Sequence, residues 1–434
     1  MQEAKEFGDG SLTSGPVEFP SSVARLPPAP LQHAASATYH PTFAFALALA
    51  SISFIGPLAV HLFMPVIPAV KIALGISEAL AQLTFSIALF VMAFATLVYG
   101  SLSDRYGRRP VLLSGLCLFL IGSGVSAFAN SVTTLVLGRL VQAVGAGCGV
   151  TLVRAIAQDV YGRNLVKAIA YLTMAYTIGP MIAPLAGGIL VDAFGWRSVF
   201  GFAIGAGALI ALGAYWAVFE SRPPSHSLSR GAERSVVGDY ASLFRHLTFT
   251  CFVSQSGLCT ASFLVTATAA SSLMKEMLHR PSAEFGLYFL LYPFGFLAGN
   301  FVTSRIGTRF ANETMVLAGS LVVFTAVAAQ TGVQLSGTVT PLTLFVPGFF
   351  ISFAQGISLP YAQAGALAIN PKLAGTAAGV GVFMQNFAGA AFAQFYGLLA
   401  DGTVVPLAQT TALTGLLSLA VGAAPFWMAR RRKT

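Results

Sequence analysis

Charged side chains are scarce in this chain: Asp, Glu, Lys and Arg make up 9% of its 434 residues, while 56% are hydrophobic. A soluble domain carries about 25% charged residues. The mean hydropathy is correspondingly high, at +0.76. These values exclude a soluble globular protein and predict a polytopic membrane protein.

Acidic residues are the scarcer charge, with 15 Asp and Glu against 24 Lys and Arg. No acidic residue lies deep in an apolar run, since all those near such runs stand at or near the ends. The basic residues are spread singly among loops and form no continuous stripe. We therefore interpret the net charge of +9 as a determinant of membrane topology and expect no nucleic-acid partner.

Cysteine is rare as well. All four cysteines fall inside apolar runs, without the spacing of a metal site or a disulfide framework, so we expect them to pack as small hydrophobes (Cys117, Cys148, Cys251 and Cys259). The sequence also lacks a nucleophile paired with a base and a phosphate-binding loop after a strand. These absences argue against an enzyme, a bound cofactor or metal, and ATP coupling.

Long apolar runs fill most of the chain, and about 20 residues suffice to cross a bilayer as a helix. We predict twelve such helices, near residues 43–66, 79–101, 111–129, 133–157, 168–190, 198–219, 248–272, 284–303, 314–331, 341–363, 376–399 and 406–428. The predicted fold class is an all-α membrane protein with two six-helix bundles.

The hydrophilic segments divide the chain. Residues 1–41 are predicted to be a disordered tail and residues 429–434 a basic C-terminus, both cytoplasmic. The longest later hydrophilic interval, residues 220–245, is predicted to link an N-terminal bundle at 42–219 to a C-terminal bundle at 246–428.

The distribution of basic residues tests this topology. Of the 24 Lys and Arg residues, four lie in loops expected outside the cell, two lie within the fourth span, and the other eighteen lie on the side expected inside. Cytoplasmic loops carry such an excess. We therefore expect both termini in the cytoplasm and the chain in the inner membrane.

The loop between the second and third spans reads GSLSDRYGRR over residues 100–109. It resembles the signature loop of the major facilitator superfamily, a fold of two related six-helix bundles. The resemblance implies a conformational latch in which Asp104 lies against the start of the eleventh span. An ion network of Arg105, Arg108 and Asp159 would complete the latch. The motif also includes Gly100, Gly107 and Arg109. The alternative is that these charges only hold the loop inside.

The second half contains a weak copy of this loop. Residues 300–309 read NFVTSRIGTR, which aligns Arg305 with Arg105, Gly307 with Gly107 and Arg309 with Arg109. Ser304 stands where Asp104 would align. Such an internal repeat is expected of two duplicated bundles.

The fourth span carries Arg139 in a stretch that resembles the superfamily's helix-4 pattern. An arginine within a membrane costs at least about 2.5 kcal/mol on insertion scales, so Arg139 should face the interior or a water-filled cavity. A purely structural role is the alternative. The glycines at 145, 147 and 149 are expected to permit close helix packing.

The fifth span reads GPMIAPLAGG over residues 179–188 and resembles the antiporter motif of the same superfamily, which marks exporters. The residues that carry the resemblance are Gly179, Pro180, Pro184, Gly187 and Gly188, with Ala183 in place of a glycine. Further stretches at 64–68, 154–159, 195–200, 284–286 and 374–378 resemble the Bcr/CflA-like branch of drug:proton antiporters.

One departure from that branch affects proton coupling. Its first helix usually carries an aspartate at the position occupied here by His61. Histidine titrates near neutral pH, so we hypothesise that His61, sensed by Arg139, is the proton-responsive group. A hydrogen-bonded packing role for His61 is the alternative.

Cationic substrates usually need a buried carboxylate, because an unpaired charge in low dielectric is costly. The expected cavity contains His61, Arg139, Arg154, Gln385 and Asn386 but no acid. We therefore predict a monomeric exporter of small neutral or anionic amphiphiles, drug-like in character, in exchange for protons. A proton-coupled importer or facilitator of a small metabolite is the alternative.

Overall fold

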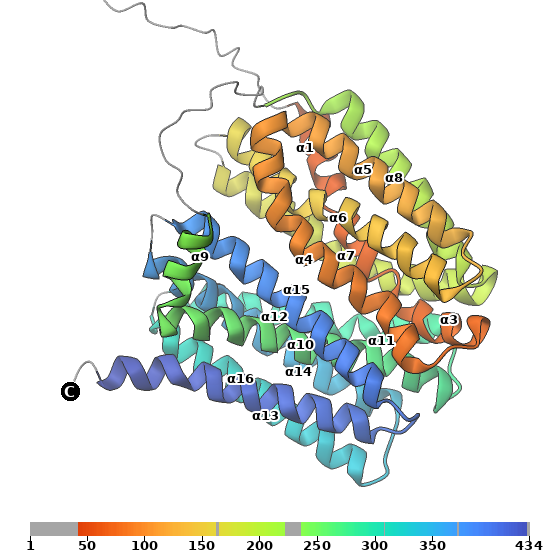
Figure 1. The fold of residues 1–434 in the computed structure, drawn as a ribbon. Helices are drawn as coiled ribbons and strands as arrows, with labels where there is room; N and C mark the ends of the chain where they lie inside the picture. The colour runs from red at the N-terminus through yellow and green to blue at the C-terminus, as the bar shows by residue number, and fades with distance from the viewer. Residues whose placement is uncertain (1–41, 162–164, 222–235, 308, 371–372, 432–434) are drawn as a thin grey trace, which may run out of the picture. The chain divides into compact units, whose positions relative to one another are not determined.

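The computed structural model describes residues 42–161, 165–221, 236–307, 309–370 and 373–431. The predicted tail at 1–41 and residues 222–235 of the predicted linker lie outside them. Within the described ranges every regular element is a helix (Figure 1). Helices are expected here, because a segment in hydrocarbon must satisfy its own backbone hydrogen bonds.

The first six spans end with α8. Their elements are α1 (Phe43–Ile52), α2 (Ile55–Val60), η1 (Met64–Val66), α3 (Ile67–Leu74), α4 (Glu78–Tyr106), α5 (Arg108–Ala127), α6 (Val132–Tyr161), α7 (Leu165–Phe194) and α8 (Arg197–Ala217). The first span comprises α1, α2, η1 and α3.

The last six spans begin with α10. Their elements are α10 (Leu247–Glu276), α11 (Ser282–Phe289), α12 (Leu291–Ile306), α13 (Asn312–Leu335), α14 (Pro341–Ile369), α15 (Ala374–Leu399) and α16 (Val405–Arg431). A short helix, α9 (Val236–Phe244), lies within the predicted linker and contacts α10. The twelve predicted spans are thereby confirmed.

Eleven of these spans in the described part of the chain are long and apolar enough to cross a membrane by length and composition alone. The twelfth, α15, is 26 residues long but less hydrophobic, because Gln385, Asn386 and Gln394 interrupt its apolar run. It packs against α4, α10 and α16.

Two spans are broken, which the apolar pattern did not predict. The first was expected to end at residue 66, but it continues to Leu74 through interruptions at 53–54 and 61–63. Pro57, Pro65 and Pro68 lie in this region, and proline removes a backbone donor and clashes with the preceding turn. The eighth span is divided at Leu290, three residues before Pro293.

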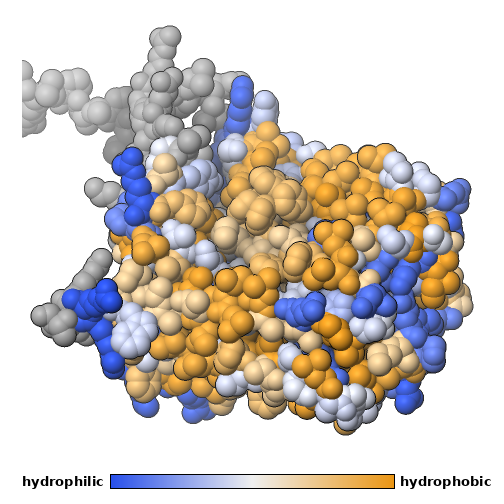
Figure 2. Space-filling view, turned by 60° about the horizontal axis from the view of Figure 1, so that its bottom comes forward, coloured by the Kyte–Doolittle hydropathy of each residue, from blue (hydrophilic) through white to orange (hydrophobic). Residues whose placement is uncertain are grey.

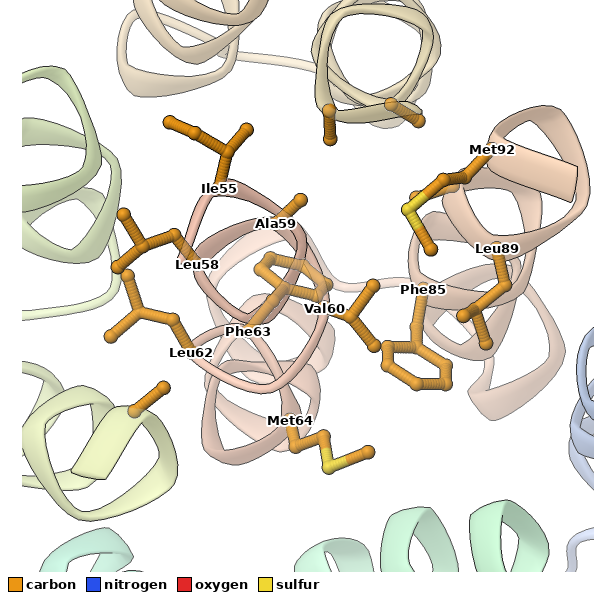
Figure 3. Close-up of a cluster of buried hydrophobic side chains, with 14 of the residues drawn as sticks. Ile55, Leu58, Ala59, Val60, Leu62, Phe63, Met64, Phe85, Leu89 and Met92 are labelled. Atoms are coloured by element: carbon orange, nitrogen blue, oxygen red, sulfur yellow. The ribbon is translucent and has the colours of Figure 1, made fainter. Parts of the chain in front are cut away.

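The broken first span forms part of the main apolar core. Figure 3 shows its side chains projecting outward around the helix axis, with Val60 pointing toward Phe85 of α4. Neighbouring helices approach closely through small residues. An added Cβ at Gly145 would overlap the backbone of α5, and one at Gly147 would lie 2.8 Å from Ala95 of α4. The predicted role of these glycines is confirmed.

The outer surface is apolar. Large side chains such as Trp216, Leu209 and Phe128 are 78%, 73% and 83% exposed. Figure 2 shows hydrophobic residues over most of one face, with hydrophilic residues gathered mainly toward the left and right margins. A water-soluble monomer rarely exposes so large an apolar area, so this surface is suited to lipid.

Candidate functional site: contacts between the two sets of six spans

An ion cluster joins the two halves at one end of the helices. Lys71 of α3 donates to both carboxylate oxygens of Glu276 of α10, at 2.7 Å each, and lies 3.0 Å from Oε2 of Glu78 of α4. Ser272 of α10 donates to Oε1 of Glu78 at 2.7 Å. Glu78 is 7% exposed. We call this end of the helices the Lys71 end.

A second contact lies at the same end. Asp192, near the end of α7, accepts hydrogen bonds from the backbone N–H groups of Ser282 (3.1 Å) and Ala283 (2.7 Å). These groups belong to the first turn of α11, where N–H groups lack helical partners and the helix dipole favours an anion. A carboxylate of the first half thus caps a helix of the second half.

The glycines of the predicted antiporter motif determine how closely α7 packs. Cβ atoms added at Gly179 and Gly187 would overlap Pro57 and the carbonyl oxygen of Leu62 in the first span. A Cβ at Gly188 would overlap the carbonyl oxygen of Ser282, and one at Gly286 of α11 would overlap the backbone of Leu185. The motif therefore allows α7 to contact both halves of the chain.

The prolines of the motif, Pro180 and Pro184, both lie inside α7, which continues as a helix through each of them. The carbonyl oxygen of Pro184 lies 2.7 Å from the position of a Cβ on Gly286. Pro184 is therefore part of the close approach between α7 and α11.

At the opposite end, the predicted latch residues form a network centred on Arg108. Its guanidinium pairs with Asp104 at 2.8 Å and Asp159 at 3.0 Å, and donates to Oγ of Ser103 at 2.5 Å. These partners belong to α4 and α6, while Arg108 begins α5. We call this end the Arg108 end.

Glu220, just after α8, accepts the backbone N–H groups of Arg108 (2.8 Å) and Arg109 (3.1 Å) and so caps α5. Gly107 takes a φ of 96° and a Cβ there would lie 2.7 Å from Glu220. The side chain of Arg109 donates to the carbonyl oxygen of Tyr215 at 2.8 Å. This cap was not predicted, since Glu220 was expected only to begin the linker.

The other latch residues have fewer contacts. The guanidinium of Arg105 lies 5.3 Å from the ring of Tyr106, and within the described residues it has no ion pair. A Cβ on Gly100 would meet open space. In the second half Gly307 has a φ of 56° and ends α12 as Gly107 ends α4, in agreement with the predicted repeat.

His61 follows α2, in an interruption of the first span. Its ring lies 6.5 Å from that of Phe289 of α11, in an edge-on arrangement, so it faces the other half of the chain. Its Nδ1 atom is buried and has no hydrogen-bond partner among the described residues.

Arg139 lies among the first six spans and is 1% exposed. Its Nε donates to the carbonyl oxygen of Thr84 at 3.1 Å, its Nη1 donates to Gln142, and its guanidinium lies 4.2 Å from the ring centroid of Phe63. Within the described residues no hydrogen bond joins His61 to Arg139, so their coupling stays a prediction.

A cavity of about 70 Å³ lies between the two halves toward the Arg108 end. Arg154 of α6 contributes its only charge among the described lining residues. The remaining lining residues come from α10, α14 and α15, namely Phe252, Val253, Ser256, Ala362, Gln363, Ala366, Leu367, Ala377, Ala378, Gly381 and Val382. Arg154 is exposed and faces the other half of the chain here.

The two predicted amides of α15 lie one turn beyond this cavity. Asn386 donates to the carbonyl oxygen of Val382 at 3.2 Å. The Nε2 atom of Gln385 is buried and has no hydrogen-bond partner among the described residues. In the part of the chain that the structure describes, no cluster of three or more His, Cys, Asp or Glu side chains could hold a metal ion.

Sequence reasoning missed the residues of the Lys71 end. The sequence indicated Lys71 only as a basic residue of an outer loop, and it indicated Glu78, Asp192 and Glu276 only as acids at or near span ends. One signal was available, since both lysine and glutamate stand where the first and second spans meet. Their partners in α10 and α11 carry no local pattern that could indicate the pairing.

In the described part of the chain, twelve spans form two sets of six, with ion pairs between the sets at the Lys71 end and a cavity toward the Arg108 end, and this arrangement is typical of a polytopic membrane transporter. A sequence model of the Major Facilitator Superfamily matches residues 49–393. The chain belongs to this superfamily, and it is a multi-pass transporter of small molecules rather than an enzyme.

Its similar relatives include bacterial resistance proteins. The chain is 27% identical to multidrug resistance protein D of Escherichia coli over 365 residues, which cover 84% of this chain and 91% of that protein. It is 25% identical to a bicyclomycin resistance protein homolog of Haemophilus influenzae over 349 residues, covering 77% and 84%. These matches agree with the resemblance to the Bcr/CflA-like branch.

Solved structures share the fold. An inward-facing, unoccupied bacterial homologue of the human lysosomal transporter Spinster is 18% identical, with a TM-score of 0.69 over 89% of this chain and 96% of that one. The D-xylose–proton symporter is 15% identical, with a TM-score of 0.70 over 90% and 97%.

Proposed function

We propose that this protein exports small amphiphilic compounds, neutral or anionic, in exchange for protons by alternating access. The observation that carries the proposal is the close approach of Gly188 in α7 to the start of α11. It gives the glycine–proline motif typical of exporters a physical role in closing one end of the transporter. The resistance proteins among the relatives support the same direction.

In this proposal the Arg108 end faces the cytoplasm, both termini are cytoplasmic, and a monomer resides in the inner membrane. The excess of basic residues on that side supports this orientation. The ion cluster at Lys71 and the Asp192 cap then close the outer side. The cavity beside Arg154 is then on the path from the cytoplasm.

We also propose that the residues around Arg108 act as a conformational latch. The Arg108 network joins α4, α5 and α6 to the end of α8, which would let the first six spans tilt as one unit. The proposed contact of Asp104 with the start of α15 would form when this side closes.

We also propose that His61 is the proton-responsive group. Its ring faces Phe289 across the two halves, and its buried Nδ1 has no hydrogen-bond partner among the described residues, so a charge on the imidazole would be costly in this conformation. The His61→Asn protein, reconstituted in vesicles, should lose pH-gradient-driven transport by about tenfold or more. Full gradient-driven transport in this variant would exclude the role.

The substrate class can be tested by a susceptibility profile in a host that lacks its own efflux pumps, with neutral, anionic and cationic compounds in parallel. We expect protection against neutral and anionic amphiphiles. Strong export of a lipophilic cation such as ethidium would contradict the proposal.

The second candidate is an importer or facilitator. It is favoured by the lack of an Asp or Glu deep within any span in the described residues, since proton coupling usually uses such a carboxylate. Transport that is insensitive to an uncoupler would support this candidate over the exporter.

A further inference from the structure

Arg154 lies deep enough to meet a substrate inside the membrane. It is seven residues before the end of α6 at Tyr161, which corresponds to about 10 Å along the helix axis. The cavity beside it has room for several water molecules, since one water needs about 10–15 Å³ in the same measure. The guanidinium is therefore exposed to a hydrated space within the span.

The charge of Arg154 has no ionic partner among the described residues. Within the described residues its guanidinium makes no ion pair and no hydrogen bond, and none of the described residues that line the cavity is acidic. An ionisable residue inside a membrane that faces a cavity is a functional candidate by default.

The chemistry of the guanidinium restricts what can bind. It has five N–H donors and no acceptor, and it matches the geometry of a carboxylate. Gln363 of α14 supplies a further polar group in the lining. The small side chains of Ala377, Ala378 and Gly381 leave an apolar wall beside them.

Arg139 differs from Arg154 in this respect. It is 1% exposed, and Thr84, Gln142 and Phe63 surround its guanidinium. Arg139 therefore has no surface to offer a substrate in this conformation, and the two arginines of α6 have different roles.

We propose that Arg154, with Gln363, forms a carboxylate-binding subsite that holds the anionic group of an amphiphilic substrate between the two halves of the transporter. This deepens the proposed export function and rests on it. A bound carboxylate would neutralise the guanidinium and connect α6 of the first half to α14 of the second.

The test uses two dansyl probes that differ in one group. N-dansyl-leucine carries a carboxylate and N-dansyl-leucinamide carries a neutral amide. Their binding to the full-length protein in phosphatidylcholine nanodiscs is measured by fluorescence. The wild-type protein should bind the carboxylate about tenfold more tightly than the amide, because a charge-assisted bidentate pair is stronger than a neutral hydrogen bond.

Arg154→Gln should bring the two affinities within about twofold by weakening carboxylate binding, with the amide affinity unchanged. Arg154→Lys keeps the charge without the fork and should retain part of the preference, which tests the subsite even if Arg154→Gln does not fold. The matched control is Arg305→Gln, because Arg305 lies over Phe301 at the end of α12 and is absent from the cavity lining. It should keep the full preference.

A full preference in both Arg154 variants, or none in the wild-type protein, would overturn the proposal. Loss of the preference when phosphatidylglycerol is added to the nanodiscs would assign the subsite to a lipid headgroup and also overturn it. A transport measurement distinguishes the export proposal from the subsite proposal. Selective binding without pH-gradient-driven movement of either probe in vesicles would refute export alone, whereas movement of both without a preference would refute the subsite alone.

Discussion

A single side chain, Lys71, joins three helices that come from both halves of the chain. Its partner Glu276 is about one-quarter exposed, whereas Glu78 is buried. Exposed ion pairs contribute about 0–1 kcal/mol, but loss of Lys71 would also leave the buried carboxylate of Glu78 with less compensation. The free energy of closure at the Lys71 end should therefore depend on this lysine.

We expect Lys71→Met to shift the population toward states open at the Lys71 end by about fivefold, which corresponds to about 1 kcal/mol. The shift can be measured by electron-spin distance measurements between labels at Ile72 and Leu287, two exposed positions in opposite halves. The control is Arg280→Met at the same end, since Arg280 pairs only at 3.8 Å with Glu284 in its own half. Equal distance distributions in the two variants would contradict the role of Lys71.

Arg108→Met should destabilise the protein by about 2 kcal/mol, because two carboxylates and a buried hydroxyl would lose their shared partner. This loss is smaller than for a fully buried network, because the side chain of Asp104 is half exposed and water screens its charge. Thermal unfolding in detergent measures the loss. Arg105→Met removes a charge from the same loop, where Arg105 contacts only Tyr106 among the described residues, and should change the melting temperature little. A similar effect of both variants would favour a purely topological role for the loop.

At the scale of helices, α7 and α11 are held together by backbone proximity rather than by side-chain volume. Gly188 and Gly286 leave room for the carbonyl oxygens of Ser282 and Pro184, and Asp192 caps α11 a turn further on. Backbone atoms cannot move aside as a flexible side chain can, so even one added methyl group should disturb the packing of α7 against α11.

Gly188→Ala should therefore separate α7 from α11 and disfavour closure of the Lys71 end by about 1–3 kcal/mol. The same pair of spin labels reports the change as a longer distance. Gly205→Ala in α8 is the matched control, because its Cβ would meet open space. An unchanged distance in Gly188→Ala would show that the two helices do not depend on this contact.

The twelve spans could be predicted because each must satisfy its own hydrogen bonds in lipid, which leaves long apolar runs in the sequence. The interruptions in the first and eighth spans were harder to predict. Pro184 lies inside an unbroken α7, whereas Pro57, Pro65 and Pro68 accompany the breaks of the first span. Whether a proline ends a helix depends on neighbours that satisfy the freed groups, and these neighbours are distant in sequence.

At the scale of the whole molecule, the contacts that close the Lys71 end join distant parts of the chain. Lys71 and Glu276 are 205 positions apart, so no local spacing could indicate their pairing. The surroundings of Arg139 likewise could not be predicted from the local sequence. Its presence in a span predicted a protected environment, but whether that environment is a bundle interior or a cavity depends on which face of α6 meets α4 and the first span.

The orientation of the whole molecule can be tested by labelling. In a background without the four cysteines, Arg280→Cys should react with a membrane-impermeant maleimide in intact cells. Arg105→Cys should react only after the membrane is permeabilised, because basic residues are retained on the cytoplasmic side. Reaction of Arg105→Cys in intact cells would invert the proposed topology and the direction of transport derived from it.

The amides of α15 have a consequence for biosynthesis. With Gln385, Asn386 and Gln394 in its sequence, this segment partitions into lipid less readily than its neighbours. Two hydrogen bonds join it to α4: the hydroxyl of Ser86 donates to the side-chain oxygen of Gln394, and the side-chain amide of Gln394 donates to the carbonyl oxygen of Ala79. We therefore expect α15 to leave the translocon efficiently only when helices made earlier are present to receive it. A ribosome-stalled chain that lacks α4 should leave this segment accessible to glycosylation or protease.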